Sequence, residues 1–262
     1  ICNRTLMLQK YDPRNNDLLV YVNGELLHRS EAKISVFDSV VQGGDAVWEG
    51  IRVYDGRIFA LDRHLRRLMD SAHALAFANI PSLDEVRATL MQTLAANNMR
   101  DQTHVRLTLT RGEKITSGMD PRLNTHGCGL IILAEWKPPV YPASIRLSTA
   151  SIRRNAPAHL DSKIHHNNLL NNILAKIEAN LAGTDDAVML DAHGFISETN
   201  ATNMFLILDG VLYTPHADAC LPGITRGLVL EIAGELGISA VEKNLSLTEL
   251  YTADEAFTTG TM

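Results

Sequence analysis

Short segments in which apolar and polar residues alternate predict β-strands in the first half of the chain. Residues 18–30 alternate around Asn23-Gly24, a pair typical of the tight turn of a β-hairpin. Further strands are expected at residues 47–54, 57–60, 104–110 and 129–134.

Helical spacing of apolar residues predicts two helices among these strands. Over residues 62–76 the apolar positions recur as expected for a helix with one buried face. Ser82-Leu83-Asp84-Glu85 has the sequence of a capping box, so a second helix is expected from there to about Asn97.

The second half of the chain predicts a similar mixture of elements. Strands are expected at residues 144–149, 187–191, 203–208, 211–214, 240–244 and 255–258. One helix is expected over residues 167–181, with an apolar side formed by Leu170, Ile173, Leu174, Ile177 and Leu181. Another is expected over 222–236, ended by Gly237. Hairpins with helices between them indicate an α+β fold with mostly antiparallel sheets, not a doubly wound sheet.

A cluster of prolines at residues 138–142 is the clearest domain boundary, because proline interrupts regular structure. We therefore predict an N-terminal α+β domain over residues 1–137, a Pro-rich linker at 138–142, and a second domain over 143–262.

Composition narrows the class of partner. The chain of 262 residues carries a net charge of −6, which argues against nucleic acid or an anionic membrane and leaves small molecules or proteins. Its three cysteines are too few and too scattered for a disulfide framework, so we expect a reducing, cytoplasmic location. There is no apolar run of the roughly 20 residues that span a bilayer and no signal-peptide core. The first residue is Ile1, which suggests processing or trimming.

Lys163 is the first candidate for chemistry. It lies in a polar loop just before the predicted helix over 167–181, and a dense His/Asn cluster follows it at residues 165–168. A lysine that attacks a carbonyl must be neutral, which cationic or dipolar neighbours favour, and His165 and His166 could supply that setting. We expect no metal at these histidines, since no carboxylate or cysteine stands at ligand spacing from them.

Glu198 is the second candidate. It lies in Ser197-Glu198-Thr199-Asn200, where a carboxylate could be a plain turn residue. It is also the type of group that keeps a pyridine nitrogen protonated, which strengthens the electron withdrawal of a pyridoxal ring.

A phosphate site is suggested by Leu221-Pro222-Gly223-Ile224-Thr225-Arg226. This segment predicts Pro222 at the first turn of a helix whose free backbone amides could bind an anion, although an ordinary Pro-started helix has the same pattern. Either Arg66 or Arg67 could add a guanidinium to the phosphate, and the helical spacing does not decide which.

Taken together, these motifs resemble the class IV aminotransferases, the fold-type IV pyridoxal-phosphate enzymes that include branched-chain and D-amino acid aminotransferases and aminodeoxychorismate lyase. The resemblance runs from about Tyr21 to the C-terminus. It is carried by Trp48-Glu49-Gly50-Ile51-Arg52-Val53-Tyr54, His64-Leu65-Arg66-Arg67-Leu68, the Lys163 loop, Ile196-Ser197-Glu198 with Asn203-Met204-Phe205, residues 221–226 and Thr259-Gly260-Thr261.

The resemblance implies a two-domain fold-type IV enzyme with pyridoxal 5'-phosphate bound mainly by the second domain. Lys163 would form the Schiff base with the cofactor and shuttle the proton between the substrate carbon and the aldehyde carbon. The other cofactor-binding residues would be Glu198 at the pyridine nitrogen, Asn168 near the phenolic oxygen, and, around the phosphate, Arg67 (not Arg66), Gly223, Ile224, Thr225 and Thr261.

The resemblance also implies a set of substrate-binding residues: Trp48, His104, Arg106, Gly260, Thr261 and Met262. Three positions depart from the branched-chain pattern. Asn168 and His104 stand where a tyrosine is usual, and Gly43 stands where an aromatic residue is usual. These changes put the substrate side chain in doubt more than the reaction type. The family also continues past Thr261, so the sequence is expected to be short at its C-terminus.

The expected activity is amino transfer between an amino acid, branched-chain as the first choice, and a 2-oxo acid such as 2-oxoglutarate, in a ping-pong cycle. D-amino acid or (R)-amine transamination, and an aminodeoxychorismate-type lyase reaction, remain alternatives. The resemblance further implies a homodimer.

Overall fold

The computed structural model describes residues 11–139 and 144–261, and within them the chain forms two compact units. The N-terminal unit contains residues 11–139 together with 164–168, and the C-terminal unit contains residues 144–163 and 169–261. The chain thus leaves the C-terminal unit directly after Lys163 and returns to it at Leu169. The predicted division into domains stays a prediction, and most of the linker at 138–142 lies outside the described residues.

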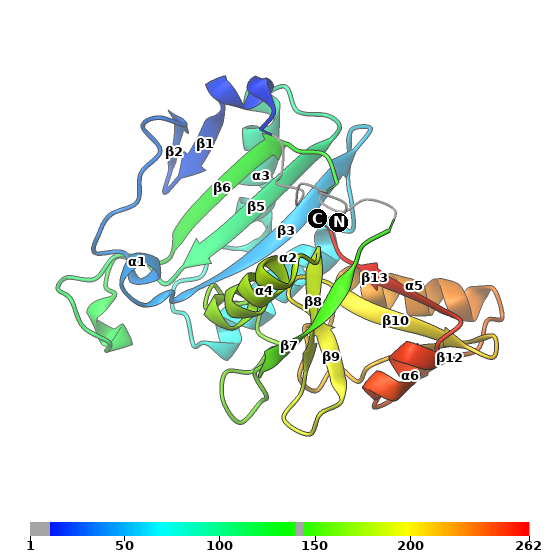
Figure 1. The fold of residues 1–262 in the computed structure, drawn as a ribbon. Helices are drawn as coiled ribbons and strands as arrows, with labels where there is room; N and C mark the ends of the chain where they lie inside the picture. Colours follow the sequence, from blue (N-terminus) through cyan, green and yellow to red (C-terminus); the bar gives the residue numbers. More distant parts are fainter. Residues whose placement is uncertain (1–10, 140–143, 262) are drawn as a thin grey trace. The chain divides into compact units, whose positions relative to one another are not determined.

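The N-terminal unit is built on one antiparallel sheet of six strands, in the order β2-β1-β6-β5-β3-β4 (Figure 1). Its strands are β1 (Leu19–Val22), β2 (Glu25–His28), β3 (Ala46–Tyr54), β4 (Arg57–Ile58), β5 (Thr103–Thr110) and β6 (Gly129–Trp136). The β1–β2 hairpin turns at Asn23-Gly24, as the sequence predicts, with both residues at positive φ.

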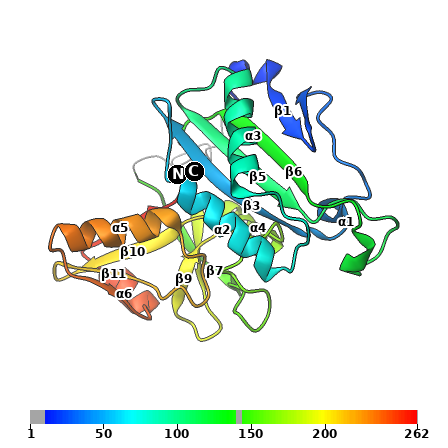
Figure 2. The same cartoon turned by 180° about the vertical axis from the view of Figure 1, so that it is seen from behind.

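Two helices, α2 (Leu61–Ala74) and α3 (Leu83–Ala96), cover one face of this sheet (Figure 2). Alternation in β5 sends Val105, Leu107 and Leu109 into the core under these helices, where each is fully buried. The capping box predicted at the start of α3 is confirmed, because the Ser82 and Glu85 side chains each bind the other residue's backbone amide. A short helix, α1 (Ser39–Gly43), and 3₁₀ turns at Pro13–Asp17 and Pro121–Leu123 were not predicted.

The C-terminal unit contains two smaller sheets. The first has the order β7-β8-β9 and the second β12-β11-β10-β13, with parallel pairing only for β7–β8 and β11–β12 among the described strands. Their bounds are β7 (Leu147–Arg153), β8 (Asp186–Leu190), β9 (Ile196–Thr199), β10 (Asn203–Leu208), β11 (Val211–Thr214), β12 (Ala240–Glu242) and β13 (Glu255–Thr259). Antiparallel sheets with flanking helices make the fold α+β, as expected.

Three helices complete this unit: α4 (Leu170–Ala182), α5 (Ile224–Glu235) and α6 (Leu247–Thr252). A core that includes Val188, Ile196, Met204 and Leu206 joins the two sheets. The side chains of α5 pack on Phe205 in the second sheet.

Helix α4 corrects the sequence prediction in two ways. It begins at Leu170, three residues later than expected, because residues 164–168 belong to the other unit. Its predicted apolar side, formed by Leu170, Ile173, Leu174, Ile177 and Leu181, does not face the sheet but is exposed. The helix instead packs on β7 and β8 through Ala175 and Ala179. The small side chains of these two alanines let the helix lie close to the sheet. Helical periodicity alone does not show whether the alanine side or the larger apolar side is the buried one.

The structure corrects two further expectations near the candidate site. Glu198 is not in a turn but inside β9, an unpredicted strand. Pro222 does not begin α5, because Gly223 is the N-cap and Ile224 the first helical residue. Over the described ranges, no helix is long and apolar enough to cross a membrane.

Candidate active site

Glu198 is a buried carboxylate held by a buried arginine of the same unit. Its side chain and that of Arg154, which directly follows β7, are each 6% exposed, and Arg154 Nε donates to Glu198 Oε1 at 2.6 Å. Asn171 of α4 accepts from Arg154 Nη1 at 3.3 Å. A buried ion pair of this kind requires that the partners compensate each other, because removing either leaves an unbalanced charge away from water.

Asn203, at the start of β10, connects Glu198 to the segment before α5. Its side-chain amide donates to Glu198 Oε2 at 3.3 Å and to the Leu221 carbonyl at 2.9 Å. The Leu221 amide also donates to Glu198 Oε2, at 3.3 Å. The predicted acid and the predicted phosphate segment are therefore brought together by a side chain to which the sequence interpretation gave no role.

The N-terminus of α5 offers backbone donors. This 12-residue helix has Gly223 as its N-cap, a residue without a side chain that could accept from the first amides. A Cβ at Gly223 would lie 2.0 Å from Asn203 Oδ1, so a larger residue would have to displace the Asn203 side chain. Amides at such a helix start, with the helix dipole behind them, favour an anion. Thr225 is half-buried in this first turn, whereas Arg226 turns away to the Pro215 carbonyl and Glu242.

The end of β13 lies beside Asn203, since Thr259 pairs with Asn203 in the sheet register. The Thr259 hydroxyl is buried, and among the described residues it has no hydrogen-bond partner. Gly260 is exposed and Thr261 half-buried, while Met262 lies outside the described residues. A buried hydroxyl without a protein partner is an unusual feature that fits a polar ligand at this end of the sheet.

Lys163 is in a turn at the edge of the C-terminal unit, and its side chain is 43% exposed. Its backbone amide donates to Asp161 Oδ1 at 3.0 Å, and its Nζ lies 3.3 Å from the same oxygen. The aspartate thus orders the turn that carries the lysine.

In the N-terminal unit the structure decides between the two arginines of α2. Arg66 is exposed, whereas Arg67 points to Glu49, with Nε 2.8 Å from Oε1 and Nη2 2.7 Å from Oε2. His64, also on α2, lies 2.7 Å from Glu49 Oε2 through its Nδ1. Burial by itself would raise the pKa of Glu49, but His165, Arg67 and His64 hold that pKa well below its ordinary value.

His165 lies on the ring of Trp48, with 4.2 Å between the ring centroids. Its Nδ1 lies 3.2 Å from Glu49 Oε1. Burial lowers the pKa of His165, whereas the neighbouring Glu49 carboxylate opposes that change.

The face of the sheet opposite α2 and α3 carries the predicted substrate residues of this unit. The Arg106 guanidinium lies 3.8 Å from the centroid of the Trp48 ring and donates to Asn167. His104 is buried, and its Nε2 has no hydrogen-bond partner within the described part of the chain. Burial, with Lys137, Arg52 and Arg106 nearby, lowers the pKa of His104 to about 3. Burial lowers the pKa of Arg106 to about 10, which still leaves it charged at neutral pH.

Asn168 is exposed, and its amide donates to the carbonyls of Gly43 and Gly44, at 3.3 Å each. A Cβ at Gly43 would meet no atom within 4 Å, so packing within this unit does not require glycine at this position.

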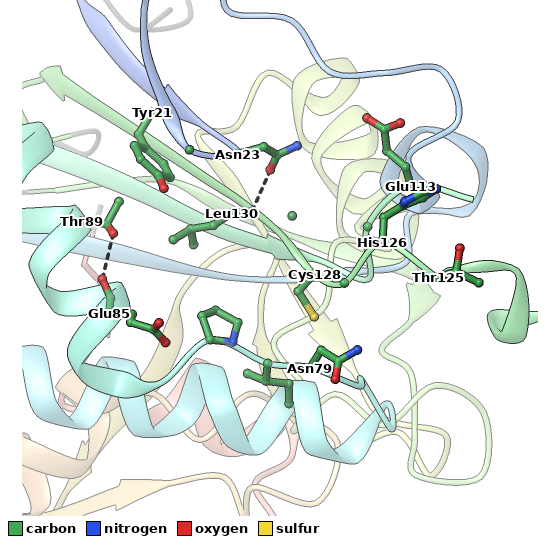
Figure 3. Close-up of a pocket in the computed structure, with 16 residues that line it drawn as sticks. Tyr21, Asn23, Asn79, Glu85, Thr89, Glu113, Thr125, His126, Cys128 and Leu130 are labelled. Carbon is green, nitrogen blue, oxygen red and sulfur yellow. Dashed lines mark hydrogen bonds between the residues drawn. The ribbon is translucent and has the colours of Figure 1, made fainter. Parts of the chain in front are cut away.

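A cavity of 980 Å³ lies elsewhere in the N-terminal unit, between the β1–β2 turn, the start of α3 and the loop before β6 (Figure 3). Tyr21, Glu85, His126 and Cys128 are among its lining residues, and none of the predicted site residues is. Burial raises the pKa of Cys128 to about 11, so its thiol is not a nucleophile at neutral pH.

The sequence motifs predicted no role for four residues that contact the predicted site residues or one another: Glu49, His64, Arg154 and Asn203. Glu49, His64 and Asn203 lie inside the quoted motifs, which could have drawn attention to them. Arg154 lies in no motif, and only its contact with Glu198 identifies it.

Comparison with known proteins assigns the chain to a family. A family model described as amino-transferase class IV matches residues 46–262. Branched-chain-amino-acid aminotransferase-like protein 2 of Arabidopsis thaliana is 59% identical over 252 residues, a match that covers 95% of this chain and 45% of that protein. The chain therefore spans about half the length of this curated relative.

Two other matches are covered more evenly. A putative branched-chain-amino-acid aminotransferase of Methanocaldococcus jannaschii is 42% identical over 247 residues, which cover 92% of this chain and 84% of that protein. The crystal structure of the branched-chain amino acid aminotransferase from Thermobaculum terrenum, in its PLP-form, has a TM-score of 0.83 and 27% identity, and the match covers 94% of this chain and 83% of that chain.

Proposed function

The chain belongs to the class IV aminotransferases, and we propose that it uses pyridoxal 5'-phosphate to move an amino group between an amino acid, branched-chain as the first choice, and a 2-oxo acid such as 2-oxoglutarate. The observation that carries the proposal is the buried carboxylate of Glu198, paired with Arg154 and joined through Asn203 to the segment that leads into α5. When bound, pyridoxal phosphate supplies a ring that accepts the electrons of the bond being broken.

The C-terminal unit has the donors and acceptors that this cofactor needs. Glu198 would hold the protonated ring nitrogen, a role supported by its burial and by its ion pair with Arg154. The amides of Gly223, Ile224 and Thr225 would bind the phosphate, as would Thr261. The Thr259 hydroxyl, which is buried and has no hydrogen-bond partner among the described residues, supports a polar ligand here.

Two predicted cofactor residues lie in the N-terminal unit. Arg67 would bind the phosphate through its guanidinium, whose plane Glu49 holds by two hydrogen bonds. Asn168 would bind near the phenolic oxygen, although its amide here donates to the Gly43 and Gly44 carbonyls.

Lys163 would hold the cofactor through Nζ until the amino donor displaces it, and the freed Nζ would then take the proton from the substrate α-carbon. The side chain is accessible, and the turn that carries it is ordered by Asp161. Alternation between two half-reactions follows from this role, because one lysine serves the donor and then the acceptor.

The cationic groups on the face of the sheet opposite α2 and α3 support an acidic acceptor. Arg52, Lys137 and Arg106 lie around the neutral His104, and the burial that lowers the pKa of each of the three is a cost that a bound carboxylate would offset. We therefore propose that His104 and Arg106 contact the second carboxylate of 2-oxoglutarate. Trp48 would contact the side chain of the amino donor, and the 260–262 backbone its α-carboxylate.

A homodimer is proposed as the working form. It is supported by the exposed apolar side of α4, formed by Leu170, Ile173, Leu174, Ile177 and Leu181, which a second copy could cover. The cytoplasmic location remains a proposal based on the few, scattered cysteines.

The experiment that tests the function combines colour and turnover. Purified protein with added pyridoxal phosphate is expected to absorb as a covalent adduct that borohydride fixes, whereas Lys163→Ala does not form it and the exposed-lysine control Lys33→Ala does. A panel of L- and D-amino acids and (R)-amines, each with 2-oxoglutarate, then identifies the donor by glutamate production. Pyruvate release without 2-oxoglutarate would replace the transferase by a lyase, and a wild type that forms no adduct would overturn the proposal.

A further inference from the structure

Glu49 joins three sequence motifs that the proposed function leaves only partly explained. It lies in β3 with a side chain that is 0% exposed. Its oxygens bind Arg67 and His64 from α2, and His165 from the segment after Lys163. Three groups that can donate hydrogen bonds therefore converge on one carboxylate.

We propose that Glu49 is a positioning residue that fixes both the guanidinium of Arg67 and the segment 164–168, and through that segment the backbone of Lys163. The proposal rests on the proposed function for the roles of Arg67 and Lys163. Glu49 itself would touch neither cofactor nor substrate.

The first part concerns Arg67. Two parallel hydrogen bonds from Nε and Nη2 to the two oxygens of Glu49 determine the plane and the direction of the guanidinium. His64 on Oε2 and His165 near Oε1 then hold the carboxylate itself. An arginine that is oriented before its anion arrives loses less rotamer entropy on binding.

The second part concerns the segment 164–168, which lies along the first residues of β3. The Trp48 amide donates to the His165 carbonyl at 2.9 Å, and the Asn167 amide donates to the Ala46 carbonyl at 2.8 Å. The His165 amide donates to Ser71 Oγ at 3.1 Å. These bonds attach the backbone to the sheet, and Glu49 adds a side-chain contact at His165 that the backbone pairing alone does not provide.

The consequence for Lys163 follows from the chain itself. The lysine directly precedes Ile164, so any register shift or loosening of residues 164–168 moves its backbone as well. A reacting amine at the end of a flexible side chain must be placed closely, and small displacements cost rate. Glu49 would therefore connect the placement of the lysine to the orientation of Arg67.

The test compares Glu49→Gln with a matched change in the same unit. Glu85→Gln also removes an ionised carboxylate that accepts two hydrogen bonds from Ser82, but it lies at the start of α3. Hydrogen exchange of the apoprotein and pyridoxal-phosphate titration are measured for both variants. For Glu49→Gln we expect exchange of the amides of residues 164–168 about tenfold faster and cofactor affinity about tenfold weaker, the effect of one lost charged hydrogen bond. For Glu85→Gln both should match wild type.

A second variant, His165→Phe, keeps the proposal testable if Glu49→Gln does not fold. His165→Phe keeps a ring on Trp48 and leaves Glu49 with Arg67 and His64, so it should speed exchange at 164–168 while cofactor affinity falls less than in Glu49→Gln. The absorbance midpoint of the bound cofactor against pH should also shift in Glu49→Gln, which a purely structural role would not cause.

Unchanged exchange at residues 164–168 in both Glu49→Gln and His165→Phe would overturn the proposal, as would equal cofactor affinity in wild type and Glu49→Gln. If the wild type binds no pyridoxal phosphate, the proposed function fails, but the exchange measurement on the apoprotein still decides whether Glu49 anchors the segment.

Discussion

Asn203 and Gly223 lie so close that a Cβ on residue 223 would stand 2.0 Å from Asn203 Oδ1. Gly223 is the N-cap of α5, and Asn203 is the residue that binds both Glu198 and the Leu221 carbonyl. The helix start and the buried acid therefore share one side chain, and the size of residue 223 controls both.

Gly223→Ala is expected to destabilise the protein by about 1–3 kcal/mol, because the added methyl must displace Asn203 from its two partners. It should also weaken pyridoxal-phosphate binding. Urea unfolding and cofactor titration measure the two effects. Gly234→Ala is the control, since a Cβ there meets open space inside α5 and should stabilise the helix by up to about 1 kcal/mol. Equal stability of Gly223→Ala and wild type would contradict the geometry.

Arg154→Met is expected to lower the free energy of unfolding by about 3–5 kcal/mol, because Glu198 would then be buried without its partner. Adding Glu198→Gln to that variant should restore part of the loss, which a double-mutant cycle in urea would quantify. As a control, Arg146→Met breaks a half-exposed pair with Asp185 at 3.8 Å and should cost no more than about 1 kcal/mol. Additive effects of Arg154→Met and Glu198→Gln on the free energy of unfolding would show that these two side chains are not coupled.

His104 should make stability depend on pH. Its pKa is lowered to about 3 in the folded protein, from the ordinary value of 6.5 that the unfolded chain retains. As the pH falls from 6.5 to 3 the unfolded chain takes up a proton that the folded chain refuses, so stability is complete above pH 6.5 and declines below it, by about 1.4 kcal/mol per pH unit from this group. His104→Gln should remove that part of the slope in urea titrations from pH 7 to 4.5, and the exposed control His73→Gln should not. Equal slopes in His104→Gln and wild type would contradict the prediction.

The exposed side of α4 should control assembly. Leu174→Glu combined with Ile177→Glu places two charges on the apolar side and is expected to shift a dimer to monomers, because burying an unpaired carboxylate in an interface is costly. Light scattering after gel filtration gives the mass. Asn180→Glu, an exposed polar position of the same helix, is the control. A double variant that stays dimeric would place the interface elsewhere.

Elements whose ends carry a local signal could be predicted from the amino-acid sequence alone. Asn23-Gly24 accepts positive φ, and the Ser82–Glu85 capping box satisfies the free amides of α3, so both could be predicted from a few neighbouring residues. The motifs were also sufficient to identify the family, because several separate segments agreed on one chemistry. The roles of the individual site residues remain proposals.

Contacts between residues distant in the chain could be identified only from the tertiary structure. Arg67 rather than Arg66 faces inward because Glu49, 18 residues earlier, accepts its guanidinium. Arg154 forms an ion pair with Glu198, 44 residues later in the chain, and no local sequence pattern predicts that pair. Helix α4 rests on Ala175 and Ala179 because small side chains allow a close approach to the sheet, although the larger apolar side predicted the opposite face. Periodicity records where apolar residues lie on a helix, and only packing decides which of them are covered.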